Sequence, residues 1–146
     1  MTTKIPSTSR SLPIALMRAR EGVMIPIREM LSDTGITEQQ WRVLRVLAEY
    51  GALDSSTLAD RASLLFPSLT RIAATMRDKG LITQTRSATD RRKQIVAIAP
   101  EGQKIIDDRT EEAVQIVADF KARLGQEKYE QLLDLLGQLD PGHRSE

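Results

Sequence analysis

The side chains best suited to bind a partner are basic and lie in two clusters in the middle of the chain. Arg71 lies near the start of a helical pattern, and Arg91, Arg92 and Lys93 lie between two strand-like runs. A guanidinium can donate two hydrogen bonds to a guanine edge, and cations on a flexible loop suit phosphates or a narrow minor groove. The spacing therefore predicts two elements that contact duplex DNA. The predicted DNA-contacting residues are Pro67, Ser68, Thr70, Arg71, Thr75, Arg91, Arg92 and Lys93.

Neither basic cluster carries this prediction alone, because an isolated surface arginine is usually solvated and has no partner. The prediction depends on the order of a helix, a turn, a second helix opened by Pro67 and Ser68, and a hairpin with a basic tip. Within that tip, Asp90 is the predicted wing-orienting residue and has two open interpretations. It either forms the turn by bonding its own backbone, or it pairs with Arg92 and aims the guanidinium.

Two helices are predicted directly before the helix that carries Arg71. Thr37 and Gln40 have the spacing of a capping box, so a helix begins at Glu38, and Gly51 ends it. Asp54 then caps a short helix.

The helix that carries Arg71 is the fourth. Pro67 suits its first position, where the missing N–H costs nothing, and Gly80 ends it. The strand-like runs Leu81–Arg86 and Gln94–Ala99 follow and form the hairpin. These elements predict a winged helix-turn-helix. The apolar stripe of the fourth helix is Leu69, Ile72, Ala73 and Met76.

Amphipathic helices are predicted on both sides of this lobe. The first covers about Leu12–Leu31 and is expected to be kinked or locally unwound at Pro26. A long helix starts at Pro100 and is broken at Gly125, and the last helix ends at Leu139. The fold class is therefore mainly α with a small β wing (α+β). The side chains predicted to be buried on the last helix are Tyr129, Leu132, Leu133, Leu136 and Leu139.

Composition excludes several classes of function. The chain has 146 residues, no cysteine and one histidine, His143, so thiol sensing, thiolate metal sites and histidine catalysis are not expected. We find no phosphate-cradling glycine loop and no nucleophile elbow, so we expect neither an enzyme nor a cofactor. No run approaches the ~20 apolar residues of a membrane span, and Met1–Ser9 does not have the pattern of a signal peptide, which predicts a cytoplasmic protein with no membrane partner.

Charge is distributed unevenly along the chain. Residues 54–98 carry eight Lys and Arg against four Asp and Glu, whereas residues 99–146 carry six against eleven. The basic middle predicts a polyanionic partner. Five scattered aromatic residues are too few to stack unpaired bases, which favours double-stranded DNA.

Over nearly its whole length the sequence resembles the MarR family of bacterial regulators, and more closely the homoprotocatechuate-degradation regulators within it. Phe66 differs from that pattern, since relatives often have a polar residue there, and Ala99 stands where a capping Thr is usual. The residues that carry the family resemblance are Thr37–Leu44, Leu58-Ala59, Pro67–Arg71, Lys79–Ile82, Asp90–Arg92 and Pro100–Gly102, and those that carry the closer one are Arg10–Leu16, Ala19–Glu21 and Ile36–Val43.

The resemblance implies an obligate homodimer whose first, fifth and sixth helices interleave and whose two recognition helices meet a pseudo-palindromic operator. It also implies a repressor released by a small aromatic carboxylate. The corresponding division of one continuous domain is an N-terminal arm and dimerisation helix (1–35), a winged helix-turn-helix DNA-binding lobe (36–99), C-terminal dimerisation helices (100–140) and a frayed tail (141–146).

An effector site for an acid needs a cation and an apolar floor. Arg20 on the first helix is the first candidate, followed by Trp41 and Arg42, and Arg18 and Arg45 remain possible. Trp41 also fits a hydrophobic staple, in which case it belongs to the core. Two alternatives stay open for the whole chain: a winged-helix module that contacts only proteins, and a MarR-type regulator of a non-aromatic effector.

Overall fold

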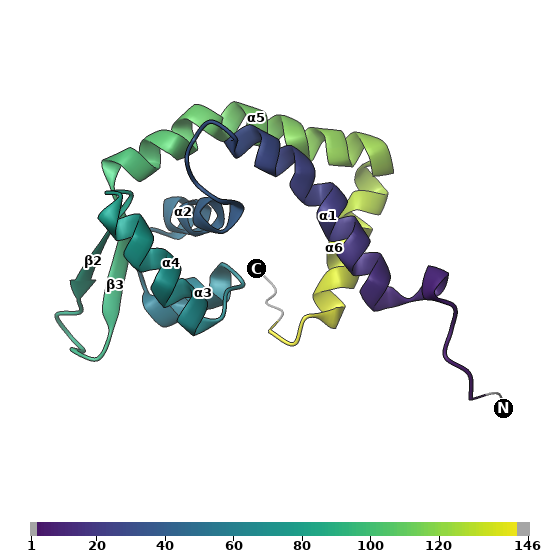
Figure 1. The fold of residues 1–146 in the computed structure, drawn as a ribbon, viewed down its shortest axis with the longest axis horizontal. Helices are drawn as coiled ribbons and strands as arrows, with labels where there is room; N and C mark the ends of the chain where they lie inside the picture. Colours follow the sequence, from purple (N-terminus) through teal and green to yellow (C-terminus); the bar gives the residue numbers. More distant parts are fainter. Residues whose placement is uncertain (1–2, 143–146) are drawn as a thin grey trace. The chain divides into compact units, whose positions relative to one another are not determined.

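The computed structural model describes residues 3–142 and is built mainly from helices (Figure 1). His143 and the tail predicted as frayed from residue 143 onward lie outside the described residues, and residues 141–142 form a turn. The elements in chain order are η1 (Thr8–Arg10), α1 (Leu12–Leu31), α2 (Glu38–Tyr50), β1 (Leu53–Asp54), α3 (Ser55–Arg61), α4 (Phe66–Asp78), β2 (Ile82–Arg86), β3 (Gln94–Ile98), α5 (Pro100–Leu124) and α6 (Gln126–Leu139).

The chain divides into two compact units, one up to residue 110 and one from residue 111 onward. The first unit holds every element through β3 together with the first turns of α5, and it contains the hydrophobic core. The second unit consists of the remainder of α5, α6 and the residues that follow. The largest fully buried side chains are Val43, Leu44, Leu47, Leu58, Leu69, Met76, Ile82 and Val96.

The starts of α2 and α3 form as their local sequence predicts. Gln40 donates its backbone N–H to Thr37 Oγ1 at 3.2 Å, and Thr37 donates its own to Gln40 Oε1 at 3.1 Å, so the capping box is complete. Asp54 Oδ1 accepts from the backbone N–H of Thr57 at 2.9 Å and caps α3. Gly51 ends α2 with a φ of 79°, a conformation in which a side chain would be strained.

Helix α4 begins one residue earlier than predicted, at Phe66, so Pro67 occupies its second position. Its predicted stripe is buried. At its C-terminus Gly80 has a φ of 77°, and the N–H of Leu81 donates to the carbonyl oxygen of Met76 at 3.0 Å. This Schellman ending turns the chain into the first wing strand.

The sheet has three antiparallel strands in the order β1-β3-β2. The predicted hairpin is present, with Ile82 opposite Ile98 and Arg86 opposite Gln94. β1 was not predicted, because a pair of residues is too short to show an alternating pattern.

The first turn of α5 lies directly against the root of the wing. A Cβ atom on Gly102 would lie 2.3 Å from the carbonyl oxygen of Leu81 and 2.9 Å from a methyl carbon of Leu44. The same carbonyl oxygen accepts the N–H of Ala99 at 2.9 Å. Only glycine permits this approach between two backbone segments.

Two expectations for the outer helices need correction. The backbone of α1 remains helical through Pro26, so local unwinding is wrong, and the alternative of a kink stays a prediction. The predicted burial on α6 is also wrong, because none of its residues is buried within the chain. The described part of the second unit has only two helical segments, which are too few to cover their own apolar faces. The exposed leucines of α6 are Leu132, Leu133, Leu135, Leu136 and Leu139.

Candidate nucleic-acid interface

The outward face of α4 carries the predicted contact residues. Thr70, Arg71 and Thr75 are exposed and Ser68 is half-buried, opposite the apolar stripe that anchors the helix. The side chain of Arg71 makes no hydrogen bond or ion pair with any residue in the range 3–142. Its guanidinium is therefore available to an external acceptor.

The two threonine hydroxyls of this face already have partners. Thr70 Oγ1 donates to the carbonyl oxygen of Phe66 at 3.1 Å, and Thr75 Oγ1 donates to that of Arg71 at 3.3 Å. Each hydroxyl oxygen can still accept a hydrogen bond, but its proton is engaged within the helix. Arg71 thus has the strongest unused donors on this face.

The N-terminus of α4 has no side-chain cap. The N-cap residue is Leu65, which has no side-chain oxygen, and Pro67 has no N–H. The backbone N–H groups of Phe66 and Ser68 meet no acceptor within the described chain. Unsatisfied N–H groups and the helix dipole make such an end favourable for an anion such as a DNA phosphate.

The wing tip is organised by Asp90. Asp90 Oδ1 accepts from the backbone N–H of Arg92 at 3.0 Å and from its Nε at 3.1 Å, so both interpretations of Asp90 hold together. The side-chain hydrogen bond from Arg92, followed by the backbone hydrogen bond, lowers the pKa of Asp90 from its ordinary value. Near neutral pH the carboxylate is therefore charged and keeps its hydrogen bonds to Arg92.

The remaining wing cations are exposed. Arg91 and Lys93 form no ion pair with the described residues, and Arg86 Nη1 donates to the carbonyl oxygen of Arg91 at 2.8 Å. Arg86, the last residue of β2, thus bonds the backbone of the loop, a contact that sequence reasoning missed.

The structure brings α4 and the wing together. Arg77 Nη1 on α4 donates to Gln84 Oε1 on β2 at 3.2 Å. The start of α3, α4 and the wing also line a shared groove of about 260 Å³. In Figure 1 the N-terminal end of α4 and the loop between β2 and β3 point toward the bottom of the view. The groove includes Phe66, Thr70, Gln84, Arg92, Lys93 and Gln94.

The three predicted effector residues do not form one cluster. Arg20 is exposed on α1 and has no polar partner among residues 3–142, whereas Trp41 is only 6% exposed and belongs to the core. Arg42 donates to both carboxylate oxygens of Glu38, at 3.0 and 3.1 Å, and to the carbonyl oxygen of Ala62 at 2.8 Å. Arg42 therefore holds the turn between α3 and α4.

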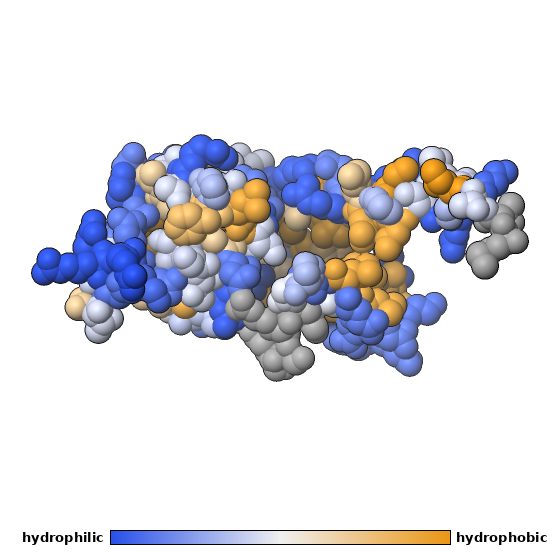
Figure 2. Space-filling model, turned by 90° about the horizontal axis from the view of Figure 1, so that it is seen from below, coloured by the Kyte–Doolittle hydropathy of each residue, from blue (hydrophilic) through white to orange (hydrophobic). Residues whose placement is uncertain are grey.

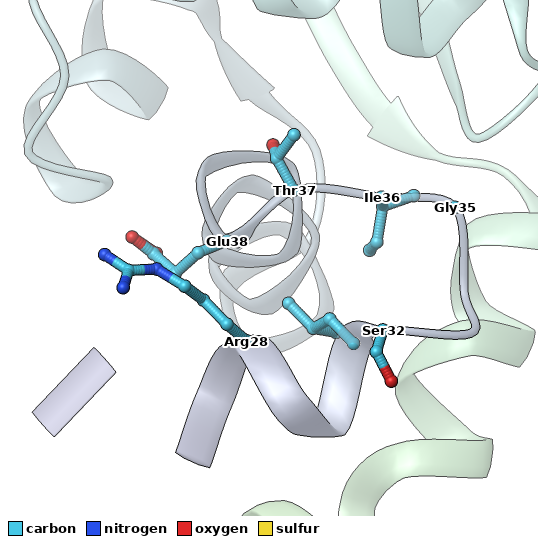
Figure 3. A pocket seen from close by; sticks show the side chains of 7 residues that line it. Arg28, Ser32, Gly35, Ile36, Thr37 and Glu38 are labelled. Carbon is cyan, nitrogen blue, oxygen red and sulfur yellow. The ribbon is translucent and has the colours of Figure 1, made fainter. Parts of the chain in front are cut away.

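A pocket of about 360 Å³ lies between the end of α1 and the start of α2 (Figure 3). Leu31 and Ile36 supply apolar surface, and Arg28 supplies a cation that extends toward Glu38. Arg28 also bonds Glu21, and these side-chain hydrogen bonds lower the pKa of Glu21 and raise that of Arg28. Sequence reasoning missed Arg28, since nothing local distinguishes it from the other arginines of α1.

Metal-binding clusters and membrane-spanning helices are both absent from the described chain. No group of three or more His, Cys, Asp or Glu side chains in residues 3–142 is arranged to hold a metal ion. No helix in that range has the length and hydropathy required to cross a bilayer.

Known proteins resemble both this fold and this sequence. The MarR family profile matches residues 36–93, which contain α2 through the wing tip. The chain is 38% identical to the HTH-type transcriptional regulator FarR of Neisseria gonorrhoeae over 91% of each chain. The chain belongs to the MarR family. This MarR-type chain is a transcriptional regulator rather than an enzyme, as its relatives and fold show.

Two other relatives add detail. This MarR-family chain is 37% identical to the homoprotocatechuate degradative operon repressor of Escherichia coli, over 86% of this chain and 85% of that one. It also matches the crystal structure of NadR in complex with 4-hydroxyphenylacetate with a TM-score of 0.79 and 36% identity, covering 94% of this chain and 97% of NadR.

Proposed function

We propose that this MarR-type regulator is a homodimeric repressor that binds a pseudo-palindromic DNA operator and is released by a small aromatic carboxylate. The observation that carries the DNA-binding part is the shared face of α4 and the wing. Arg71 and the uncapped helix end lie on α4, and Arg91, Arg92 and Lys93 lie on the hairpin joined to it through Arg77 and Gln84. A repressor of this kind acts on chromosomal DNA, so we expect it in the cytoplasm.

On this face, the helix and the wing have different tasks. Pro67, Ser68, Thr70, Arg71 and Thr75 enter the major groove, where Arg71 reads a base edge. Arg91, Arg92 and Lys93 contact phosphates or the minor groove, and Asp90 orients Arg92.

Exposed apolar side chains support the homodimer. Both terminal regions display them, and apolar patches are visible among the hydrophilic ones in the space-filling view (Figure 2). A two-fold axis would let each subunit cover the other with the same surface. The division of the chain into dimerisation helices over 1–35 and 100–140 and a DNA-binding lobe over 36–99 is part of this proposal. On α1 the exposed apolar residues are Leu12, Leu16, Met17, Val23 and Ile25.

The effector part of the proposal is supported by two relatives. One is named as a repressor of homoprotocatechuate degradation and another was solved with 4-hydroxyphenylacetate, and both concern aromatic acids. The pocket beside Arg28 places a guanidinium, already bonded to Glu21, next to apolar surface, and Arg20 is a second cation on the same helix, with no side-chain hydrogen bond or ion pair in residues 3–142. Trp41 and Arg42 would then support the site from the core and from the turn, instead of binding the acid directly.

The test uses the full-length protein and a duplex enriched from a randomised DNA library. Saturable binding that weakens when one half-site is scrambled, and weakens again on addition of 4-hydroxyphenylacetate, is the expected result. Arg20→Ala and Arg28→Ala should retain DNA binding and lose part of the response to the acid. A protein that enriches no duplex would instead be a protein-interaction module, and an unchanged affinity with every carboxylate added would indicate a non-aromatic effector.

A further inference from the structure

Two large apolar side chains are exposed at the start of the recognition helix, where contacts to bases are expected. Leu65, the N-cap residue, is 78% exposed, and Phe66, the first helical residue, is 51% exposed. The other apolar residues of α4 that the sequence assigned to its stripe are buried. Leu65 and Phe66 therefore do not belong to the hydrophobic core of the subunit.

Phe66 lies within the polar surface proposed to contact DNA, and Leu65 directly precedes it in the chain. Phe66 lines the same groove as Thr70, Arg92 and Lys93. Figure 2 views the side to which the N-terminal end of α4 and the wing tip point, and it shows apolar patches between hydrophilic ones. An exposed apolar side chain in this position would meet DNA on the proposed binding face.

The polar side chains next to Leu65 and Phe66 offer few contacts that could distinguish one base from another. The proton of the Thr70 hydroxyl is donated to the carbonyl oxygen of Phe66, and Ser68 is half-buried. Arg71 can recognise guanine through its N7 and O6 acceptors. In the major groove, the feature that apolar side chains distinguish is the C5-methyl group of thymine.

We infer that Leu65 and Phe66 are specificity-determining residues that contact thymine C5-methyl groups in the major groove of each operator half-site. This inference rests on the proposed DNA binding and adds to it the class of base that the apolar pair selects. Burying a group of the size of one methyl contributes enough free energy to change affinity about fourfold, since ~0.8 kcal/mol corresponds to that ratio. Two symmetric half-sites would together give about fifteenfold.

The experiment replaces each thymine of the selected duplex by deoxyuridine, which removes only the methyl group. With the wild-type protein, at least one thymine per half-site should be sensitive, at about fourfold in Kd. With Leu65→Ala and Phe66→Ala the same replacement should have little effect, because the contact is already lost. Phe66→Leu should restore part of the sensitivity.

A control within the same helix separates this contact from general weakening. Arg71→Ala should lower affinity and yet leave the deoxyuridine effect near fourfold. Wild-type binding that is indifferent to every deoxyuridine, or an unchanged deoxyuridine effect in both alanine variants, would overturn the inference and leave the proposed DNA binding in place. A wild-type protein that selects no duplex would overturn both.

Discussion

Arg42 Nη1 donates a 2.8 Å hydrogen bond to the carbonyl oxygen of Ala62, the C-cap residue of α3. The same guanidinium pairs with Glu38 one turn earlier on α2, and its Nη1 also reaches the carbonyl oxygen of Ser63 at 3.3 Å. Ser63 has a φ of 53°, in the left-handed region that non-glycine residues rarely adopt. One side chain therefore stabilises the turn that sets α4 at its angle to α3.

Arg42→Ala should lower the free energy of unfolding by about 1–3 kcal/mol, because it removes charge-assisted hydrogen bonds and leaves the largely buried Glu38 unpaired. Urea denaturation measures the change. Arg45→Ala is the matched control, since Arg45 lies on the same helix, is exposed and has no partner in residues 3–142. Equal stability losses in the two variants would show that the contact to the turn is energetically unimportant.

Gly102→Ala should be strongly destabilising, by more than about 2 kcal/mol, because the new Cβ would meet the carbonyl oxygen of Leu81 at 2.3 Å. Gly22→Ala provides the opposite case, since nothing lies within 4 Å of the position that its Cβ would take and its helix continues on both sides. That substitution should stabilise by about 0.5–1 kcal/mol. Thermal unfolding of both variants tests the pair, and a stable Gly102→Ala protein would contradict the close approach.

Asp54→Ala should cost about 1 kcal/mol near neutral pH through loss of the α3 cap. Hydrogen bonds from the backbone and the hydroxyl of Thr57 lower the pKa of Asp54 below its ordinary value of 3.8. A lowered folded-state pKa means that the stabilisation is fully present above the ordinary value and is lost as the pH falls from there through the folded-state pKa. The stability difference between wild type and Asp54→Ala should therefore shrink below about pH 4, as measured by urea melts across that range. A stability difference between the two proteins that grows as the pH falls would refute the role of Asp54 as the cap of α3.

Arg71→Ala should weaken operator binding by roughly 1–3 kcal/mol and relax base preference, because Arg71 is placed to read a base edge. Arg91→Ala and Arg92→Ala should weaken all duplexes more evenly and lower the slope of affinity against salt by about one charge. Binding titrations at several salt concentrations, on the selected operator and on a scrambled duplex, distinguish the two classes. If both classes change affinity alike on both duplexes, the division of tasks between helix and wing fails.

Local sequence predicted the helices and the hairpin because their signals lie within a few residues. The capping box at Thr37, the αL glycines at Gly51 and Gly80 and the alternating strands each depend on neighbours along the chain. The start of α4 was displaced by one residue, since Phe66 adopts helical geometry before the proline. The boundaries of α6 were predicted correctly, and only the burial of its leucines was not.

The contacts that organise the site could not be predicted from local sequence. Arg42 meets Ala62 twenty positions later, and Arg77 meets Gln84 across two elements, so neither contact has a periodic signature. The sequence therefore did not reveal that Arg42 bonds the turn, and its effector role stays a prediction. Asp90 was predictable because Arg92 lies two residues away and an aspartate in a tight turn has few partners.

The uncapped N-terminus of α4 links DNA binding to the stability of the folded chain. A serine or aspartate at the N-cap would typically stabilise such a helix by about 1 kcal/mol, and Leu65 forgoes that contribution. A phosphate that accepts from the free N–H groups binds the folded chain and not the unfolded one, and so shifts the folding equilibrium toward the native state. A molecule without DNA is then less stable toward unfolding than a bound one.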